Sequence, residues 1–321
     1  MIITTATRAG RGELLSTEAD GRRTVVVAMA ANLGVAIAKL IAGSLTASSA
    51  MLAESFHAMA DTGNEALLLV AQWRGGKPPD DQHPLGHGRE AYFWALLASL
   101  GVFVTGALLS LRQGVDALIN PEEVGHFPVA YLVLVISFGL DGVSLLRVYR
   151  QIKRDADSLQ RDFFEQFGLM SDPVARAVFA EDAAAIAGNL IALTGIALHQ
   201  ITGSALPDGI AAILIALVLA YVAFELVRRN RDFIIGQQAP EGLRQAAKQI
   251  ILSQPGILGV GEMISPFLGP RKVWVSAKID IDDNLTGAQV KELLRSTEDA
   301  LMQWSPYIMK VYLTPTGTHE A

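Results

Sequence analysis

The sequence predicts a polytopic α-helical membrane protein with six transmembrane helices and a C-terminal α+β domain of ferredoxin-like type. Three observations lead to this fold class. The 321 residues are 51% hydrophobic and only 18% charged, with a mean hydropathy of +0.34, which is more apolar than a typical soluble domain. Connections rich in lysine and arginine alternate with connections that lack both along the N-terminal part of the chain. After residue 231 the residue pattern becomes that of a small soluble domain.

Six apolar segments are each long enough for the roughly 20 residues that cross a bilayer. They occupy residues 24–46, 48–73, 91–119, 128–149, 174–201 and 205–227. The second and the fifth contain acidic residues, so hydropathy alone identifies them poorly. We therefore expect a cytoplasmic N-terminal segment at residues 1–23, a six-helix transmembrane domain at 24–232 and a cytoplasmic ferredoxin-like domain at 233–321.

The distribution of basic residues predicts the orientation in the membrane. Lysine and arginine occur in the N-terminal segment and in alternate connections, whereas the connections at 44–48, 120–127 and 199–207 contain none. Positively charged loops stay in the cytoplasm, so both termini are predicted to be cytoplasmic in a multi-pass protein of the cell (inner) membrane. The first 23 residues contain no separate apolar segment with a cleavage site, and we expect no signal peptide.

The remaining elements follow from local signals. The segment 151–170 is charged and roughly amphipathic, and we expect it to continue the fourth span on the cytoplasmic side. Ser171 or Asp172 is suited to cap the next helix, with Pro173 in its first turn. In the C-terminal part, helices are predicted at 240–255 and 286–304, and strands at 259–264, 273–281 and 308–313. This α-β-β-α-β order suits a ferredoxin-like domain.

Composition excludes several function classes. The chain has no cysteine, which excludes disulfides, thiolate metal ligands and a cysteine nucleophile. Any metal ligands are therefore imidazole nitrogens and oxygens. The net charge of −6 and the lack of a basic, aromatic-rich patch argue against nucleic acid as a partner.

The second span carries ionisable residues on one face. At about 100° per residue, the spacings of three, four and four place Glu54, His57, Asp61 and Glu65 together. Such side chains in a membrane span are costly and usually line an ion path, whereas in a soluble protein the same stripe would be an ordinary solvated face. His57 and Asp61 can bind one divalent cation from a single helix turn. Lys39 on the first span is expected to reach the outer interface with its long side chain, or to pair with an acid.

Two further acids, Glu181 and Asp182, lie in a part of the fifth span that is rich in small residues. Adjacent residues on a helix point about 100° apart, so we expect only one of them to face His57 and Asp61 fully. The small residues allow another helix to approach closely. The alternative interpretation is a buried hydrogen-bonded network of His57 and the acids, without metal.

The loop at residues 78–90 contains two histidines and two aspartates within eight positions: Asp80, Asp81, His83 and His87. These residue types are suitable zinc ligands, and Gly86 and Gly88 permit the tight backbone that brings them together. A solvated polar turn is the alternative.

Taken together, these motifs resemble the cation diffusion facilitator family of zinc transporter type. The resemblance covers nearly the whole chain from residue 32, and rests on the approach from Gly43 to Glu54, the His57-xxx-Asp61 pair, the loop at 80–90 and Asp182. Residues 269–277 and the pair at 181–182 resemble the branch that contains the human mitochondrial zinc transporter.

The resemblance implies a homodimer of the fold described above, which exports Zn²⁺ or a related divalent ion against a flow of protons. It implies a transport site at His57, Asp61 and Asp182, and a loop site at Asp80, His83 and His87.

The chain departs from the family pattern in three places. Val178 stands where most zinc members carry a histidine, four residues before the fifth-span aspartate, and Glu181 or water is expected to supply the missing contact. An oxygen in place of a nitrogen makes Mn²⁺ or Fe²⁺ more plausible than in an ordinary member. The C-terminal domain has no histidine before His319, so we expect no regulatory zinc cluster there. Gly236 replaces a linker acid that would pair with Arg89.

We therefore expect a secondary active transporter, not an enzyme, that exports a divalent metal ion, Zn²⁺ first, by proton antiport and alternating access. It needs no permanent cofactor, and its partners are the metal ion, protons, the lipid bilayer and a second copy of the chain. The alternatives are an exporter of Mn²⁺ or Fe²⁺, a membrane metallohydrolase, and a non-transporting scaffold with a dimerising soluble domain. A metallohydrolase is expected to carry His-Glu-xx-His or a comparable three-ligand motif, which the sequence lacks.

Overall fold

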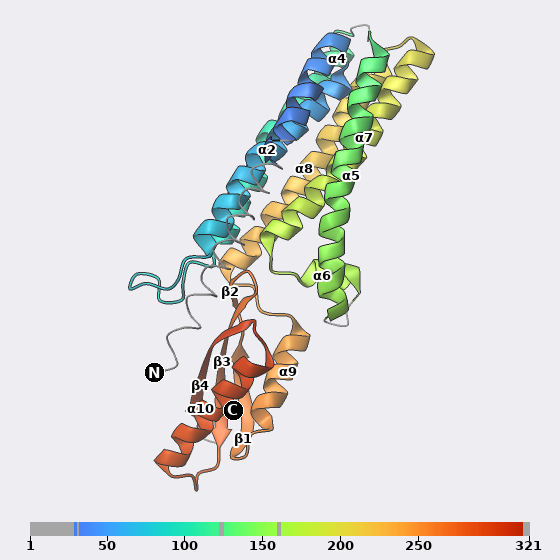
Figure 1. Ribbon diagram of the computed structural model, residues 1–321. Coiled ribbons are helices and arrows are strands. Elements are labelled where there is room, and N and C mark those ends of the chain that lie inside the picture. The colour runs from blue at the N-terminus through green and yellow to red at the C-terminus, as the bar shows by residue number, and fades with distance from the viewer. Residues whose placement is uncertain (1–28, 31, 122–124, 159–161, 317–321) are drawn as a thin grey trace, which may run out of the picture. The chain divides into compact units, whose positions relative to one another are not determined.

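The computed structural model describes residues 29–121 except 31, residues 125–158 and residues 162–316 (Figure 1). The predicted segment 1–23, the beginning of the first predicted span and His319 lie outside the described residues. The chain divides into two compact units. The first contains the described parts of Met1–Leu67, Ala98–Arg147 and Phe179–Phe224, and the second contains those of Leu68–Leu97, Val148–Val178 and Glu225–Ala321.

Long helices make up most of the N-terminal two thirds of the described chain. A first helix is described at Asn32–Thr46, and it is followed by α2 (Ser49–Gly75), α3 (Glu90–Gly101), the π-helical turn η1 (Val102–Ala107), α4 (Leu108–Ile119), α5 (Phe127–Ser158), α6 (Phe163–Leu169), α7 (Pro173–Thr202) and α8 (Leu206–Ile235). The elements α3, η1 and α4 form one continuous helical span.

Four of these helices are long and apolar enough to cross a membrane: Glu90–Ile119, Phe127–Asp157, Pro173–Thr202 and Leu206–Ile235. They match the third to sixth predicted spans. The first helix is shorter in its described part, and α2 contains ionisable residues, as the sequence indicated. The polytopic helical fold is confirmed, and the count of six spans stays a prediction.

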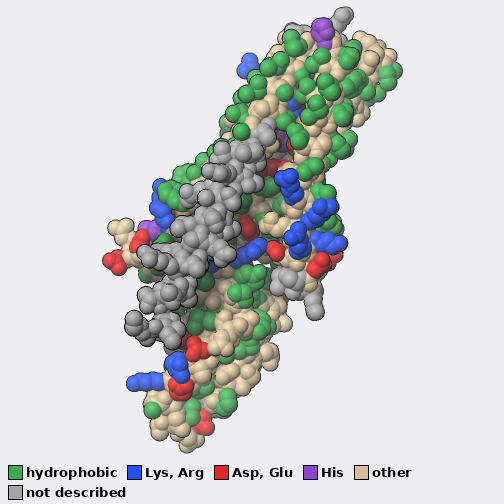
Figure 2. Space-filling view, viewed as in Figure 1, with side chains coloured by type: hydrophobic (Ala, Val, Ile, Leu, Met, Phe, Trp, Pro, Cys, Tyr) green, Lys and Arg blue, Asp and Glu red, His purple; other side chains and the backbone are tan. Residues whose placement is uncertain are grey.

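The first unit is a helix bundle with an apolar core cluster. Small and aliphatic residues of the first helix, α2, α5, α7 and α8 form one buried cluster, which includes Met51, Leu134, Ile196 and Ile215. Large apolar side chains remain exposed on the opposite sides of α5 and α8: Leu132, Val135, Ile136, Leu217, Tyr221 and Phe224. Figure 2 shows apolar side chains spread over the visible face of the helices. A surface of this kind is suited to contact with lipid.

Two local predictions around α7 are confirmed. Helix α5 continues past the apolar segment to Ser158. Helix α7 begins at Pro173, and the Asp172 carboxylate accepts hydrogen bonds from the backbone N–H groups of Val174 (3.1 Å) and Ala175 (3.2 Å). Asp172, rather than Ser171, is therefore the cap of this helix.

The C-terminal part of the second unit has the predicted ferredoxin-like order. It contains α9 (Glu241–Leu252), β1 (Ile257–Ile264), β2 (Phe267–Gly269), β3 (Lys272–Ile281), α10 (Gly287–Trp304) and β4 (Ile308–Thr316). Strand β3 is central, because β1 and β2 pair with it antiparallel and β4 pairs with it parallel. The three-residue strand β2 was not predicted, since so short a segment has no measurable period.

The period-two pattern of β3 explains how this domain forms a core. Val273, Val275, Ala277 and Ile279 are buried in one cluster with Ile251 of α9 and Leu293 and Leu301 of α10. Helix α10 begins with a capping box between Thr286 and Gln289. The other side chains of β3 lie on the opposite face of the sheet.

Candidate metal-binding sites

The first half of the ionisable stripe of α2, Glu54 and His57, is deeply buried, whereas Asp61 and Glu65 are partly exposed. His57 Nε2 lies 3.2 Å from Asp61 Oδ2, and His57 Nδ1 lies 3.7 Å from Glu54 Oε1. The side chains of His57 and Glu54 are 1% and 0% exposed. The spacing of three and four residues therefore brings an imidazole between two carboxylates, as the sequence predicted.

Lys39 pairs with this stripe. Its Nζ lies 2.8 Å from Glu54 Oε2, and its side chain is 2% exposed. The sequence left open whether Lys39 reaches an interface or pairs with an acid, and the second alternative is confirmed.

Several atoms of the stripe have no hydrogen-bond partner among the described residues. They include both ring nitrogens of His57, Oε1 of Glu54 and Oδ1 of Asp61. Buried polar groups are costly unless a hydrogen bond or a ligand satisfies them. The stripe thus offers nitrogen and oxygen lone pairs to a proton, a water molecule or a metal ion.

The acids of α7 contact other partners in this structure. Both carboxylate oxygens of Glu181 accept hydrogen bonds from the Asn64 amide of α2, and Asp182 Oδ2 accepts one from Ser144 Oγ of α5 at 2.7 Å. Within the described parts of the chain, no group of three ligand atoms closer than 4.8 Å to one another includes His57. The assembly of His57, Asp61, Glu181 and Asp182 into one transport site therefore stays a prediction.

The sequence analysis missed the buried Asp208, and it named no partner for the half-buried Asp141. Asp208 of α8 accepts hydrogen bonds from Ser48 Oγ at 2.7 Å and from the backbone N–H groups of Ser49 and Ala50. It satisfies the first turn of α2 from a distant part of the chain. Asp141 accepts a hydrogen bond from Asn189 Nδ2 at 2.7 Å. The only signal for Asp208 was an acid next to a proline at the start of an apolar segment.

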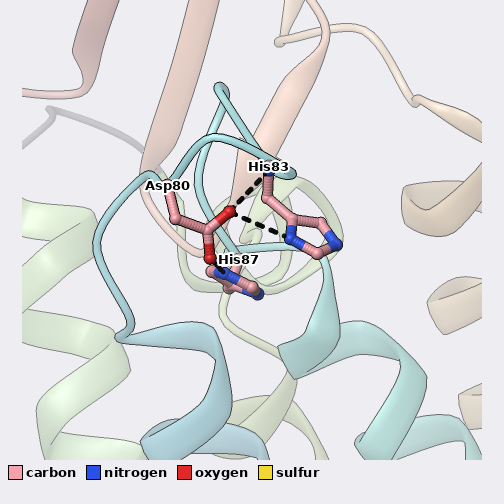
Figure 3. A group of neighbouring side chains, drawn as sticks. All are labelled: Asp80, His83 and His87. Atoms are coloured by element: carbon pink, nitrogen blue, oxygen red, sulfur yellow. Dashed lines mark hydrogen bonds and ion pairs between the residues drawn. The ribbon is translucent and has the colours of Figure 1, made fainter.

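The loop cluster is assembled. Asp80 Oδ1 lies 3.2 Å from His83 Nδ1, and Asp80 Oδ2 lies 2.8 Å from His87 Nε2 (Figure 3). In Figure 3 both imidazole rings converge on the same carboxylate. Each residue offers a ligand atom within 4.8 Å of the others. This combination of two nitrogens and one oxygen suits a divalent metal ion.

Hydrogen bonding within the loop favours the charged carboxylate. The His87 side chain and the backbone N–H of His83 donate to Asp80 and lower its pKa to about 2. The same Asp80 hydrogen bond raises the pKa of His87. A ligand set with an ionised carboxylate at neutral pH is therefore present in the free protein.

Contacts with the C-terminal strands hold the loop in place. Lys310 Nζ of β4 donates to the Pro84 carbonyl at 2.8 Å. A Cβ atom at Gly88 would collide with the Leu268 carbonyl oxygen of β2, so only glycine fits there. Gly86 has φ of 81°, in the left-handed region that favours glycine, and this fits the tight backbone expected of this loop. The Arg89 guanidinium lies 3.5 Å from where a Cβ of Gly236 would be, and that position offers it no carboxylate.

Comparisons with known proteins identify relatives of the chain. A family model described as the cation efflux transmembrane domain matches residues 25–235. The chain is 28% identical over 260 residues to a Homo sapiens protein named proton-coupled zinc antiporter SLC30A9, mitochondrial, over 81% of this chain and 46% of that protein. It is 27% identical over 264 residues to metal tolerance protein C4 of Arabidopsis thaliana, over 82% of this chain and 58% of that protein.

Further matches include a cation-efflux pump and a structure of a single domain. The chain is 27% identical over 283 residues to the cation-efflux pump FieF of Shewanella oneidensis, over 83% of this chain and 87% of that protein. A structure of a MamM CTD variant matches with 18% identity and a TM-score of 0.23, over 25% of this chain and 95% of that one. The chain spans about half the length of the SLC30A9 relatives, with 46% of the human protein covered.

Proposed function

This chain belongs to the cation efflux family, also called cation diffusion facilitators, and from this premise we propose that it exports a divalent metal ion, Zn²⁺ first, in exchange for protons. Membership of this family makes it a multi-pass membrane transporter rather than an enzyme, with the metal ion as substrate rather than cofactor. The metal and the proton coupling are our proposals, supported by the names of relatives that include zinc antiporters.

The contact between the buried His57 and the partly exposed Asp61 is the observation that carries this proposal. An imidazole and a carboxylate lie 3.2 Å apart on α2, and atoms of both have no partner among the described residues. Such groups inside a membrane helix are expensive unless they bind a cation or a proton. We propose that Asp182 and Glu181 of α7 complete the transport site when the two helices move together.

Charge balance gives the mechanism. Histidine binds a metal ion only as a neutral imidazole, and carboxylates bind only when ionised, so metal and protons compete for the same lone pairs. We propose that metal enters from the cytoplasm, that helix movement exposes the site to the other side, and that protons there displace the metal from His57 and the acids. The proposed orientation has both termini cytoplasmic, in the inner membrane, and the proposed assembly is a homodimer.

Metal-driven proton release tests the function. The purified protein in liposomes is expected to release protons when Zn²⁺ is added, and comparison with Mn²⁺, Fe²⁺ and Cd²⁺ ranks the substrates. If no metal drives proton release, the protein is a non-transporting scaffold rather than a transporter. The valine at position 178, where most zinc members have a histidine, would then explain why it does not transport metal.

Export of Mn²⁺ or Fe²⁺ is the second candidate. The proposed site has one nitrogen ligand, from His57, and otherwise oxygens, because Val178 stands in the usual position of a second histidine. Oxygen ligands favour harder ions. Faster flux with Mn²⁺ or Fe²⁺ than with Zn²⁺ would select this candidate.

The substitution Glu181→Ala tests whether this acid replaces the missing histidine. We expect Zn²⁺ flux to fall by about 10-fold or more, because loss of even an outer partner of a metal ligand typically costs that much. The matched control is Val178→Ala, one turn earlier on the same helix, which removes no ligand. Equal flux in both variants would assign the missing contact to water.

The substitution Asp80→Ala tests the loop site. The substitution removes the carboxylate whose two oxygens contact the two imidazoles, and the protein is expected to bind one Zn²⁺ fewer per chain in equilibrium dialysis. The neighbouring Asp81→Ala is the control, because Asp81 is exposed and lies outside the cluster. Equal metal content in the two variants would make the loop a solvated polar turn.

A further inference from the structure

The ion pair of Lys39 and Glu54 has no part in the mechanism described above. Both side chains are almost fully buried, at 2% and 0% exposure, and Lys39 Nζ lies 2.8 Å from Glu54 Oε2. The pair uses only one of the two carboxylate oxygens. The other oxygen, Oε1, lies 3.7 Å from His57 Nδ1, and neither atom has a hydrogen-bond partner among the described residues.

A second helix leaves room for this carboxylate. A Cβ atom at Gly188 of α7 would collide with Glu54 Oε1, so a residue larger than glycine does not fit beside this carboxylate. Lys39 of the first helix thus binds Oε2 of Glu54, and the glycine of α7 leaves space for Oε1. The direction of the carboxylate toward His57 is thus fixed by residues outside α2.

The position of the Glu54 carboxylate can decide which nitrogen of His57 carries the hydrogen. A neutral imidazole carries a hydrogen on one ring nitrogen and a lone pair on the other, and the partner of the N–H decides which nitrogen has which. Histidines that bind metals commonly donate their second N–H to a carboxylate, which fixes the tautomer and the ring orientation. Here the carboxylate of Glu54 lies on the Nδ1 side of His57, and the carboxylate of Asp61 lies on the Nε2 side.

We propose that Glu54, held by Lys39, is the positioning residue for His57: it accepts the Nδ1–H of the imidazole and leaves the Nε2 lone pair beside Asp61 for the metal ion. Lys39 compensates the charge of Glu54, so the carboxylate serves as an acceptor without adding net charge to the site. This inference rests on the proposed function of His57 and Asp61 as metal ligands.

The tautomer of His57 tests the proposal without transport or metal. Nitrogen NMR spectra of the metal-free protein with ¹⁵N-labelled histidine are recorded at about pH 8.5, well above the ordinary histidine pKa of about 6.5. The signals of His57 are those that disappear in His57→Ala. We expect the Nδ1–H tautomer in the wild type. An Nε2–H tautomer in the wild type would overturn the proposal.

The matched variant replaces the whole pair by apolar residues, Lys39→Met with Glu54→Leu, so that no unpaired charge is left inside the protein. It is expected to lose the preference for the Nδ1–H tautomer, and an unchanged spectrum would overturn the proposal. Lys39→Arg keeps a cation beside Glu54, and it is expected to keep the wild-type tautomer.

A double-mutant cycle separates positioning from a purely structural role. The Asp80→Ala background removes the loop site. In this background, the double replacement Lys39→Met with Glu54→Leu is expected to lower Zn²⁺ affinity by about 10–100-fold, as for other outer partners of metal ligands. The same double replacement is expected to have no further effect once His57 is alanine. An equal loss in both backgrounds would overturn the proposal. If the wild type transports no metal, the proposed function fails, and the His57 spectra still decide the positioning role.

Discussion

Replacing Asp61 by alanine is expected to abolish metal-driven proton release in liposomes, with a loss of at least about 100-fold. The variant removes a ligand atom 3.2 Å from His57 Nε2, and it leaves one imidazole as the only ligand on α2. A single neutral nitrogen cannot offset the cost of taking a divalent ion out of water in a membrane helix. The measurement is the initial rate of proton release after addition of Zn²⁺.

Asp116→Ala is the matched control for this prediction. Asp116 is an exposed carboxylate of α4 that forms an ion pair with Arg112 at 3.6 Å. Its removal is expected to leave the rate within twofold of the wild type, since exposed ion pairs contribute little. A rate for Asp61→Ala equal to that of Asp116→Ala would show that the α2 stripe has no role in transport.

Local signals were sufficient for most of the fold. The cap at Asp172, the capping box at Thr286 and the alternation in β3 each depend on residues a few positions apart. The loop cluster is also local, because Asp80, His83 and His87 lie within one short turn that two glycines allow. Periodicity and turn chemistry are properties of neighbouring residues, and the sequence displays them directly.

The partners of the buried acids could not be predicted in the same way. Glu54 accepts a hydrogen bond from Lys39 of another helix. Glu181 accepts one from Asn64, which is 117 positions away in the sequence, and Asp208 accepts one from Ser48, which is 160 positions away. No period or spacing specifies such pairs, since they depend on how the helices pack. For the same reason, the sequence could identify the four candidate transport residues, but it could not predict which of them contact one another in this structure.

Replacing Lys39 by methionine is expected to lower the free energy of unfolding by about 3–5 kcal/mol, the usual cost of removing one partner of a buried ion pair. The Glu54 carboxylate would remain fully buried without the cation that lies 2.8 Å away. The measurement is denaturant unfolding in detergent. Lys278→Met is the control, because Lys278 pairs with Glu262 at 3.6 Å on the surface, where the side chains are 42% and 70% exposed. That substitution is expected to cost less than about 1 kcal/mol.

The double replacement Lys39→Met with Glu54→Leu is expected to recover most of the stability lost in Lys39→Met, because an apolar pair of similar volume needs no charge compensation. Because the double variant is expected to be stable, its transport rate distinguishes a structural role of the ion pair from a role in orienting His57. If the ion pair served only to hold the first helix to α2, the double variant would transport metal like the wild type. If Glu54 orients His57, the double variant is expected to be folded and stable, yet to bind Zn²⁺ poorly. A single Lys39→Met variant as stable as the wild type would contradict the premise that this pair is buried and ionised.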